Sequence, residues 1–240
     1  MDTVHMSAHM SASADYRTAR AELAAAERQL RAAAERVAAL RGALPPGPEV
    51  DPGTPLTMAG GKPVTLGGLF GPHRSLVTYG LRFDEGWERP CPASAMWVDG
   101  LDALTPHLAE RAGVAVLAPA SPGQLAAVVA RRGWSWVPVV SSQPSDLVDR
   151  LGLRAGAGAG AGTGSGGLMS AVTVFHWGDD GRVRLHWQAT EGAPTPTPAG
   201  GATDAGSLDF LCAAWGLLDL LPEGRAAWRP TRQDRPLPRR

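Results

Sequence analysis

The spacing of apolar residues near the start of the chain is typical of a long helix with a narrow apolar stripe. Apolar residues recur every seven positions, and a second apolar residue follows most of them after three positions. The first set is Tyr16, Leu23, Leu30, Val37 and Leu44, and the second is Ala19, Ala26, Ala33 and Leu40. This pattern predicts a helical arm, which either packs on its own domain or pairs with another helix as a coiled-coil dimer arm.

A different pattern, with short apolar runs between helical segments, follows the arm. Residues 75–83 are rich in β-branched and aromatic side chains, and residues 114–119 are apolar throughout, as expected for strands inside a sheet. Residues 136–140 are a further strand candidate. The runs 171–177 and 182–188 flank a Gly-Asp-Asp-Gly turn, and this arrangement predicts a β-hairpin.

Capping residues and prolines mark the helices between these strands. Residues 92–104 have helical composition, and Thr105 followed by Pro106 predicts the start of a second helix. A Ser-Pro pair at position 121 opens another helix, and residues 208–221 predict an apolar final helix. The resulting order predicts an α/β fold, a thioredoxin-like sheet flanked by helices, with an N-terminal helical arm.

Low-complexity stretches and proline-rich segments predict the domain organisation. Two stretches rich in Gly, Ala, Pro and Thr lack side chains that could fill a core, so we expect flexible insertions there. The expected layout is a disordered N-terminus (1–14), the helical arm (15–46), a linker, a thioredoxin-like domain (60–228) with insertions at about 155–168 and 191–206, and a disordered tail (229–240).

Composition narrows the functional classes. Lys and Arg number 23, as do Asp and Glu, so no net charge attracts the chain to nucleic acid or to an anionic membrane. We find no apolar run of membrane-spanning length, and the first fifteen residues lack the apolar segment of a secretory signal. These features predict a soluble cytoplasmic protein. With only two cysteines, Cys91 and Cys212, thiol chemistry here depends on single thiols.

Cys91 is the candidate catalytic residue, because it follows a predicted strand and loop and directly precedes Pro92 at the start of a helix. A thiol there faces unpaired backbone N–H groups and the positive end of the helix dipole, which both favour the nucleophilic thiolate. Arg89 would add to this effect if it points inward, whereas the acidic residues of the loop would oppose it. Trp87 would belong to an aromatic wall beside the thiol, although core packing is the ordinary role of such residues.

Several stretches of the chain carry a family resemblance. They are residues 66–70, 87–101 (WERPCPASAMWVDGL), 106–111 (PHLAER), 133–142 (GWSWVPVVSS), 172–177 and 217–224 (LLDLLPEG), together with the leading helix. In these stretches the chain resembles the predicted dithiol-disulfide oxidoreductases, a thioredoxin-like family of largely unassigned function. The resemblance implies a redox site at Cys91-Pro92-Ala93-Ser94, and it is most specific around Cys91.

The chain departs from this family at two positions. Ser94 stands where the family usually has a second cysteine, and a hydroxyl cannot resolve a mixed disulfide. The sequence Met169-Ser170-Ala171 also lacks the proline that thioredoxin-like enzymes commonly place before the hairpin. Three interpretations of Cys91 follow. The first is a monothiol oxidoreductase or peroxide-reducing site, in which Ser94 donates a hydrogen bond to the sulfur. The second is a catalytically degenerate scaffold used for binding or assembly, and the third is unrelated chemistry.

The remaining residues indicate neither a metal nor another cofactor. His176 and His186 would project to opposite faces of a simply paired hairpin, and the Gly-rich run precedes a strand where a phosphate loop requires a helix. Cys212 lies among apolar residues and is expected to fill the core. The expected partners are a small thiol or a disulfide-bearing protein, and a second copy of the chain through the N-terminal helix.

Overall fold

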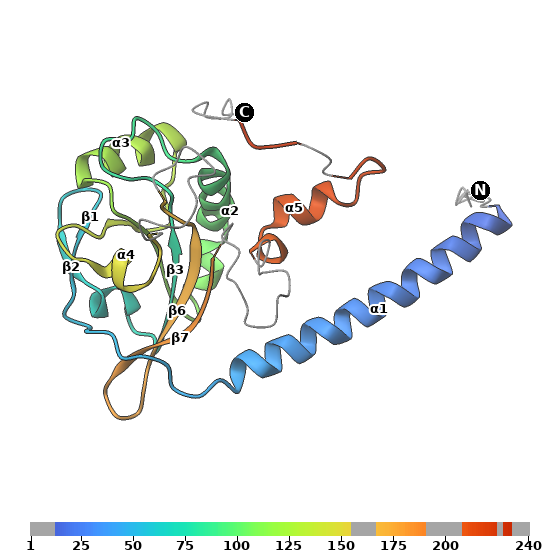
Figure 1. Cartoon of the computed structure of the whole chain (residues 1–240), viewed down its shortest axis with the longest axis horizontal. Helices are drawn as coiled ribbons and strands as arrows, with labels where there is room; N and C mark the ends of the chain where they lie inside the picture. The colour runs from blue at the N-terminus through green and yellow to red at the C-terminus, as the bar shows by residue number, and fades with distance from the viewer. Residues whose placement is uncertain (1–12, 155–166, 191–207, 225–227, 232–240) are drawn as a thin grey trace, which may run out of the picture. The chain divides into compact units, whose positions relative to one another are not determined.

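The computed structural model contains one seven-stranded mixed sheet in the order β2-β1-β5-β4-β3-β6-β7 (Figure 1). The strands are β1 (Pro55–Met58), β2 (Pro63–Thr65), β3 (Ser75–Gly80), β4 (Gly113–Ala118), β5 (Val139–Ser141), β6 (Ala171–Trp177) and β7 (Val183–Thr190). β4 lies parallel to β3 and to β5, whereas β6 is antiparallel to β3 and forms a hairpin with β7. This is the thioredoxin arrangement, and it confirms the predicted fold class.

The structure describes residues 13–154, 167–190, 208–224 and 228–231. Most residues of the predicted flexible insertions and of the predicted disordered termini lie outside these ranges, so those predictions stay open. The chain divides into two units, Met1–Pro45 and Pro46–Arg240, and the sheet begins at Pro55, ahead of the domain start expected at residue 60.

The first unit contains the predicted arm as one helix, α1 (Ala14–Gly42). Its N-terminus is capped by Ser13, whose hydroxyl accepts a hydrogen bond from the Tyr16 N–H over 3.1 Å. Such a cap satisfies one of the backbone donors that a first helical turn leaves unpaired. Arg41 in the last turn complements the negative end of the helix dipole.

Helices cover both faces of the sheet, and the alternation of side chains along β4 shows the two layers. Val114 and Val116 pack on one face, and Ala115 and Leu117 pack on the other. The first face carries α2 (Pro92–Leu108), α3 (Pro122–Arg132) and α5 (Ala213–Leu218), and the second carries a 3₁₀ turn (Gly67–Phe70) and α4 (Leu147–Arg150). Both faces are therefore buried, as the all-apolar run of β4 predicts.

Three predicted elements differ in the structure. The segment expected to be a linker contains β1, which pairs with β2 and β5. The two helices expected around Thr105 are one helix, α2, because Pro106 lies near its end and interrupts only the last turn. The Thr105 hydroxyl donates to the Leu101 carbonyl over 2.8 Å within this helix and does not cap a new one.

The final helix is much shorter than expected. Residues 209–211 form a 3₁₀ turn and α5 spans only Ala213–Leu218, because the side chains that reach the core are Leu208, Cys212 and Trp215. Phe210, within the same apolar run, is exposed. Cys212 is 8% exposed within the core, as expected for a structural cysteine.

A segment that precedes the sheet pairs with its outer strand, β7. The Val50 N–H donates to the Val183 carbonyl, and the Leu185 N–H donates to the Pro48 carbonyl, each over 2.9 Å. Gly47 fits here because a Cβ at this position would lie 2.0 Å from the Leu185 carbonyl oxygen. Part of the β7 edge is thus covered by this segment.

Candidate functional site

Cys91 is the N-cap residue of the seventeen-residue helix α2, which starts with Pro92 as predicted. Its backbone N–H donates to the Arg82 carbonyl and its carbonyl accepts from the Ala95 N–H, both over 2.9 Å. These bonds hold the start of α2 against the segment that leaves β3. Cys91 is a free cysteine and is half-buried, and its side chain makes no capping hydrogen bond to the first turn of α2.

The loop between β3 and Cys91 is anchored to three other segments of the chain, which follow α4, follow β5 and lie in α3. Asp84 forms an ion pair with Arg154, and the Glu85 carboxylate accepts a hydrogen bond from Gln143 over 3.2 Å. The Gln124 amide of α3 donates to the Trp87 carbonyl over 3.2 Å. This anchoring holds the approach to Cys91 in place.

The ion pair also changes the charge balance expected from the sequence. The hydrogen bond to Asp84 raises the pKa of Arg154 above its ordinary value, with a further contribution from Asp149. Arg154 thus compensates an acidic group that was expected to oppose a thiolate at Cys91. The sequence contains no local signal for this contact, because the two residues are 70 positions apart.

Ser94 is fully buried behind Cys91 and belongs to a cluster of hydroxyl groups. Its Oγ lies 3.2 Å from the Tyr79 hydroxyl, 3.1 Å from the Ser170 hydroxyl and 3.0 Å from the Arg82 N–H. A serine hydroxyl accepts two hydrogen bonds and donates one, so all three contacts hold only if Ser94 donates to Tyr79 or Ser170. The predicted hydrogen bond from Ser94 to the Cys91 sulfur would have to replace one of these three.

The other predicted site residues take different positions. Ala93 is half-buried in the first turn of α2, and Trp87 packs in part against the core on the α2 face. Arg89 is exposed, with its Nε 3.6 Å from the Glu88 carboxylate. Trp97 stacks on Tyr79 with ring centroids 4.9 Å apart, which assigns that tryptophan to the core beneath the hydroxyl cluster.

Asp102 is a buried group whose role the sequence analysis did not identify. It is 9% exposed, and its Oδ1 accepts backbone hydrogen bonds from Ser135, Trp136 and Val137 over 3.1, 2.8 and 2.9 Å. It thereby joins α2 to the segment that enters β5. The sequence does contain a signal for this role, because Asp102 lies among apolar residues on one side of the helix. A carboxylate that is buried in this way requires hydrogen-bond donors from a neighbouring segment.

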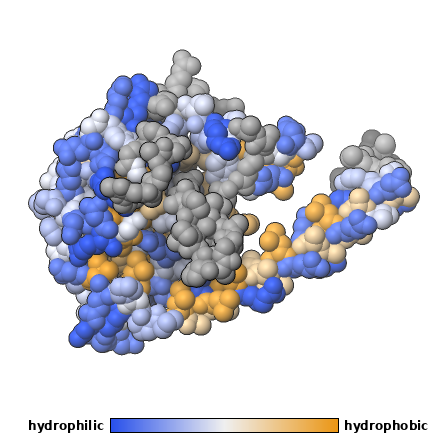
Figure 2. Space-filling view, viewed as in Figure 1, coloured by the Kyte–Doolittle hydropathy of each residue, from blue (hydrophilic) through white to orange (hydrophobic). Residues whose placement is uncertain are grey.

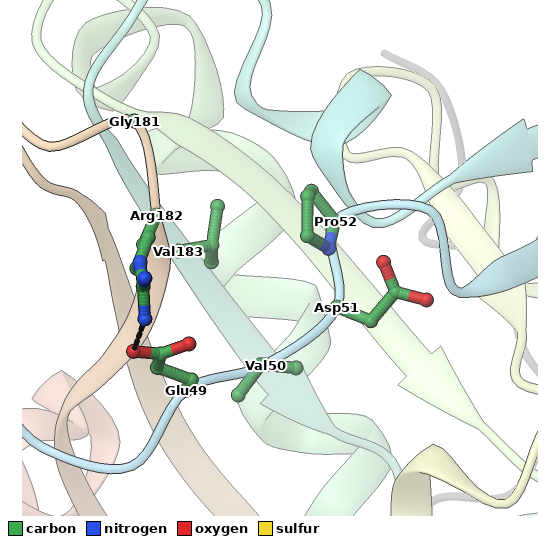
Figure 3. Close-up of a pocket in the computed structure, with 7 residues that line it drawn as sticks. All are labelled: Glu49, Val50, Asp51, Pro52, Gly181, Arg182 and Val183. Atoms are coloured by element: carbon green, nitrogen blue, oxygen red, sulfur yellow. Dashed lines mark hydrogen bonds and ion pairs between the residues drawn. The ribbon is translucent and has the colours of Figure 1, made fainter.

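A surface hollow of about 290 Å³ lies far from this thiol (Figure 3). Its lining is Glu49, Val50, Asp51, Pro52, Gly181, Arg182 and Val183. Arg182 donates to Glu49 over 2.6 Å along one side of the hollow. The β3–β6 pairing sets Ser75 opposite His176 and Gly80 opposite Ala171, so the turn at Gly181 is at the opposite end of the sheet from Cys91. The hollow therefore does not belong to the thiol site.

Within the described ranges, no three His, Cys, Asp or Glu side chains are grouped so that they could hold a metal ion. The helices that the structure describes include none that is long and apolar enough to cross a membrane.

Comparisons with known proteins give a family and several distant structures. Residues 6–235 match a family model described as "Bacterial protein of unknown function (DUF899)", and no curated protein matches the chain. A mutant of peroxiredoxin Q from Xanthomonas campestris is 19% identical, with a TM-score of 0.47 over 71% of this chain and 96% of that chain. Peroxidoxin BcpB from Mycobacterium tuberculosis is 13% identical, with a TM-score of 0.46 over 70% and 94%.

Proposed function

Because the chain belongs to the family of bacterial proteins of unknown function (DUF899), its activity has to follow from its own site, and we propose that it is a thioredoxin-fold thiol-disulfide oxidoreductase that works with one cysteine. The observation that carries this proposal is the free, half-buried Cys91 as the N-cap residue of α2, with the buried Ser94 three positions after it. The resemblance to the predicted dithiol-disulfide oxidoreductases supports the same chemistry.

The substrate class is a disulfide between a substrate thiol and a small thiol. The Cys91 thiolate attacks the sulfur of the small thiol, a new disulfide forms at Cys91, and the substrate leaves as its thiolate. A second small-thiol molecule, as thiolate, then attacks the same sulfur, which releases the symmetric small disulfide and the Cys91 thiolate. Cys91 stands at the N-terminus of α2, where the positive end of the helix dipole favours a thiolate in both steps.

The second step needs an external thiol, because the described residues offer no internal one at the site. Ser94 lacks a sulfur, and Cys212 is buried in the core at the start of α5. A compartment that maintains reduced small thiols supplies this reagent, and the cytoplasm is such a compartment. We therefore place the reaction there.

The first test is the rate at which iodoacetamide labels the native protein across pH, with Cys91→Ser and Cys212→Ser as matched variants. We expect Cys91 to label at least ten-fold faster at neutral pH than the same residue in the denatured chain, and Cys212 to stay protected in the native state. Labelling of Cys91 no faster than an unfolded thiol would favour the alternative function, a non-enzymatic binding or assembly module on the same scaffold.

The second test asks whether the mixed disulfide at Cys91 persists because the site has no second sulfur to resolve it. A mixed disulfide with a small thiol is formed at Cys91 and followed by mass spectrometry in wild type and Ser94→Cys. We expect the wild-type adduct to persist until external thiol is added. In Ser94→Cys the new thiolate attacks the Cys91 sulfur and expels the small thiol without any addition. Spontaneous loss of the adduct from the wild type would contradict the monothiol mechanism.

A further inference from the structure

Helix α1 carries a stripe of apolar side chains along its length and has no buried residue (Figure 2). Leu23, Leu30 and Leu40 are 48%, 62% and 69% exposed. A stripe of this kind in water is unfavourable and commonly marks an interaction surface. We propose that α1 joins two copies of this chain as an antiparallel coiled coil, with a two-fold axis at the level of Arg28.

The distribution of large and small residues selects the antiparallel orientation. The heptad position that begins at Tyr16 is large throughout, whereas the position that begins at Ala19 is alanine until Leu40. A parallel pair in register places identical residues opposite each other, so layers of two large residues would alternate with layers of two alanines. With a constant distance between the two helix axes, the alanine layers would leave voids. An antiparallel pair instead places a large residue opposite a small one in each central layer.

A two-fold axis at Arg28 pairs every residue of the stripe that lies within α1. Each layer pairs one residue with a different residue of the second copy, as a two-fold interface requires. From the outer layer to the axis, the pairs are Tyr16 with Leu40, Ala19 with Val37, Leu23 with Ala33, and Ala26 with Leu30, and each occurs twice. The helix of 29 residues is about 44 Å long, so these layers extend along nearly all of it.

Charges beside the stripe favour the same orientation. In the antiparallel pair, Glu22 of each copy lies beside Arg36 of the second copy, which gives two attractive contacts. In a parallel pair in register, Glu22 would instead lie beside Glu27, and Arg36 beside Arg41, although Asp15 and Arg20 would attract. Charge repulsion thus opposes the parallel pair at two of its three charged positions.

One repulsive contact remains in the antiparallel pair, where the two copies of Glu27 meet at the axis. Arg20 of the same helix lies 3.9 Å from the Glu27 carboxylate and offsets part of that charge. Charges beside the interface are therefore balanced by contacts within each helix as well as by contacts between the two helices.

The oligomeric state of the full chain is the first test, measured by sedimentation equilibrium at micromolar concentration. We expect the wild type to form a dimer of 25.0 kDa chains. Leu23→Arg, on the stripe, should raise the dimer dissociation constant at least 100-fold, whereas Ala21→Arg, on the outer side of the same turn, should change it less than three-fold. A monomeric wild type, or equal effects of both variants, would overturn the proposal.

The second test measures the orientation by pulsed electron spin resonance on the Cys91→Ser background. Spin labels at Thr18→Cys should be about 30 Å apart along the axis in the antiparallel dimer, because residues 18 of the two copies are separated by twenty positions. Labels at Arg28→Cys should show no such axial separation, which makes this variant the matched control. Equally short distances at both positions would indicate a parallel pair and overturn the antiparallel assignment.

Discussion

The side-chain oxygens of Ser94 and Ser170 lie 3.1 Å apart, and both residues are fully buried. Ser94 lies in the first turn of α2, and Ser170 directly precedes β6. Their hydrogen bond therefore joins the first turn of α2 to the start of β6.

Ser94→Ala should lower the free energy of unfolding by about 1–3 kcal/mol, because it leaves buried donors from Tyr79 and Arg82 without this acceptor. Urea denaturation measures the loss. Ser75→Ala is the matched control, since its hydroxyl makes an exposed contact with His176 and its removal should cost less than about 0.5 kcal/mol. Equal losses in the two variants would show that the hydroxyl cluster does not stabilise the fold.

Asp102→Ala should destabilise the domain more strongly, by about 3 kcal/mol, because three backbone N–H groups lose a charged acceptor at a buried site. Hydrogen exchange should show faster opening at residues 135–137 together with the shift in the denaturation midpoint. Glu88→Ala removes an exposed carboxylate and serves as the control. If exchange at residues 135–137 is unchanged, Asp102 does not hold this segment.

The ion pair between Asp84 and Arg154 should contribute a coupling energy of about 0.5–1 kcal/mol in a double-mutant cycle, since Arg154 is partly exposed and solvent screens the pair. Arg154→Gln should also accelerate hydrogen exchange in the loop before Cys91, whereas Arg182→Gln at the far end of the sheet should not. Unchanged exchange in the loop would indicate that its other anchors suffice.

Asp180 provides a test by pH. The hydrogen bond from Arg184 lowers the pKa of Asp180 to about 2, below the ordinary value of an aspartate. Because the folded value is depressed, ionised Asp180 stabilises the hairpin above about pH 4, and this contribution is lost as the pH falls through 2. Carboxyl NMR titration should find the low pKa in wild type and a higher pKa in Arg184→Gln. The same value in both proteins would contradict the assignment.

Local signals explain why much of the fold could be predicted. The apolar run of β4 and the Ser-Pro pair that opens α3 each depend on neighbouring residues, and their order implies the sheet. β1 was missed because four residues with mixed burial give little periodic signal. The predicted final helix was too long because an apolar run does not show which of its residues reach the core. Phe210, for example, lies in this run but is exposed.

Only the features of the site that depend on neighbouring residues in the sequence could be predicted. A proline directly after Cys91 located the start of α2 correctly. The contacts of Ser94 with Ser170 and of Asp84 with Arg154 join residues 76 and 70 positions apart. Such contacts depend on how strands pair, so the hydroxyl cluster and the anchored loop could not be read from spacing.

The backbone bonds from Pro48 and Val50 to β7 also affect how the protein behaves in a crowded solution. An outer strand with unpaired N–H and C=O groups is a template for a strand of another molecule, and such pairing leads to aggregation. Here the chain itself occupies the first part of β7, near Val183 and Leu185. Replacing Gly47 by a bulkier residue would displace this cover, so the expected phenotype is sheet-to-sheet association of otherwise folded molecules.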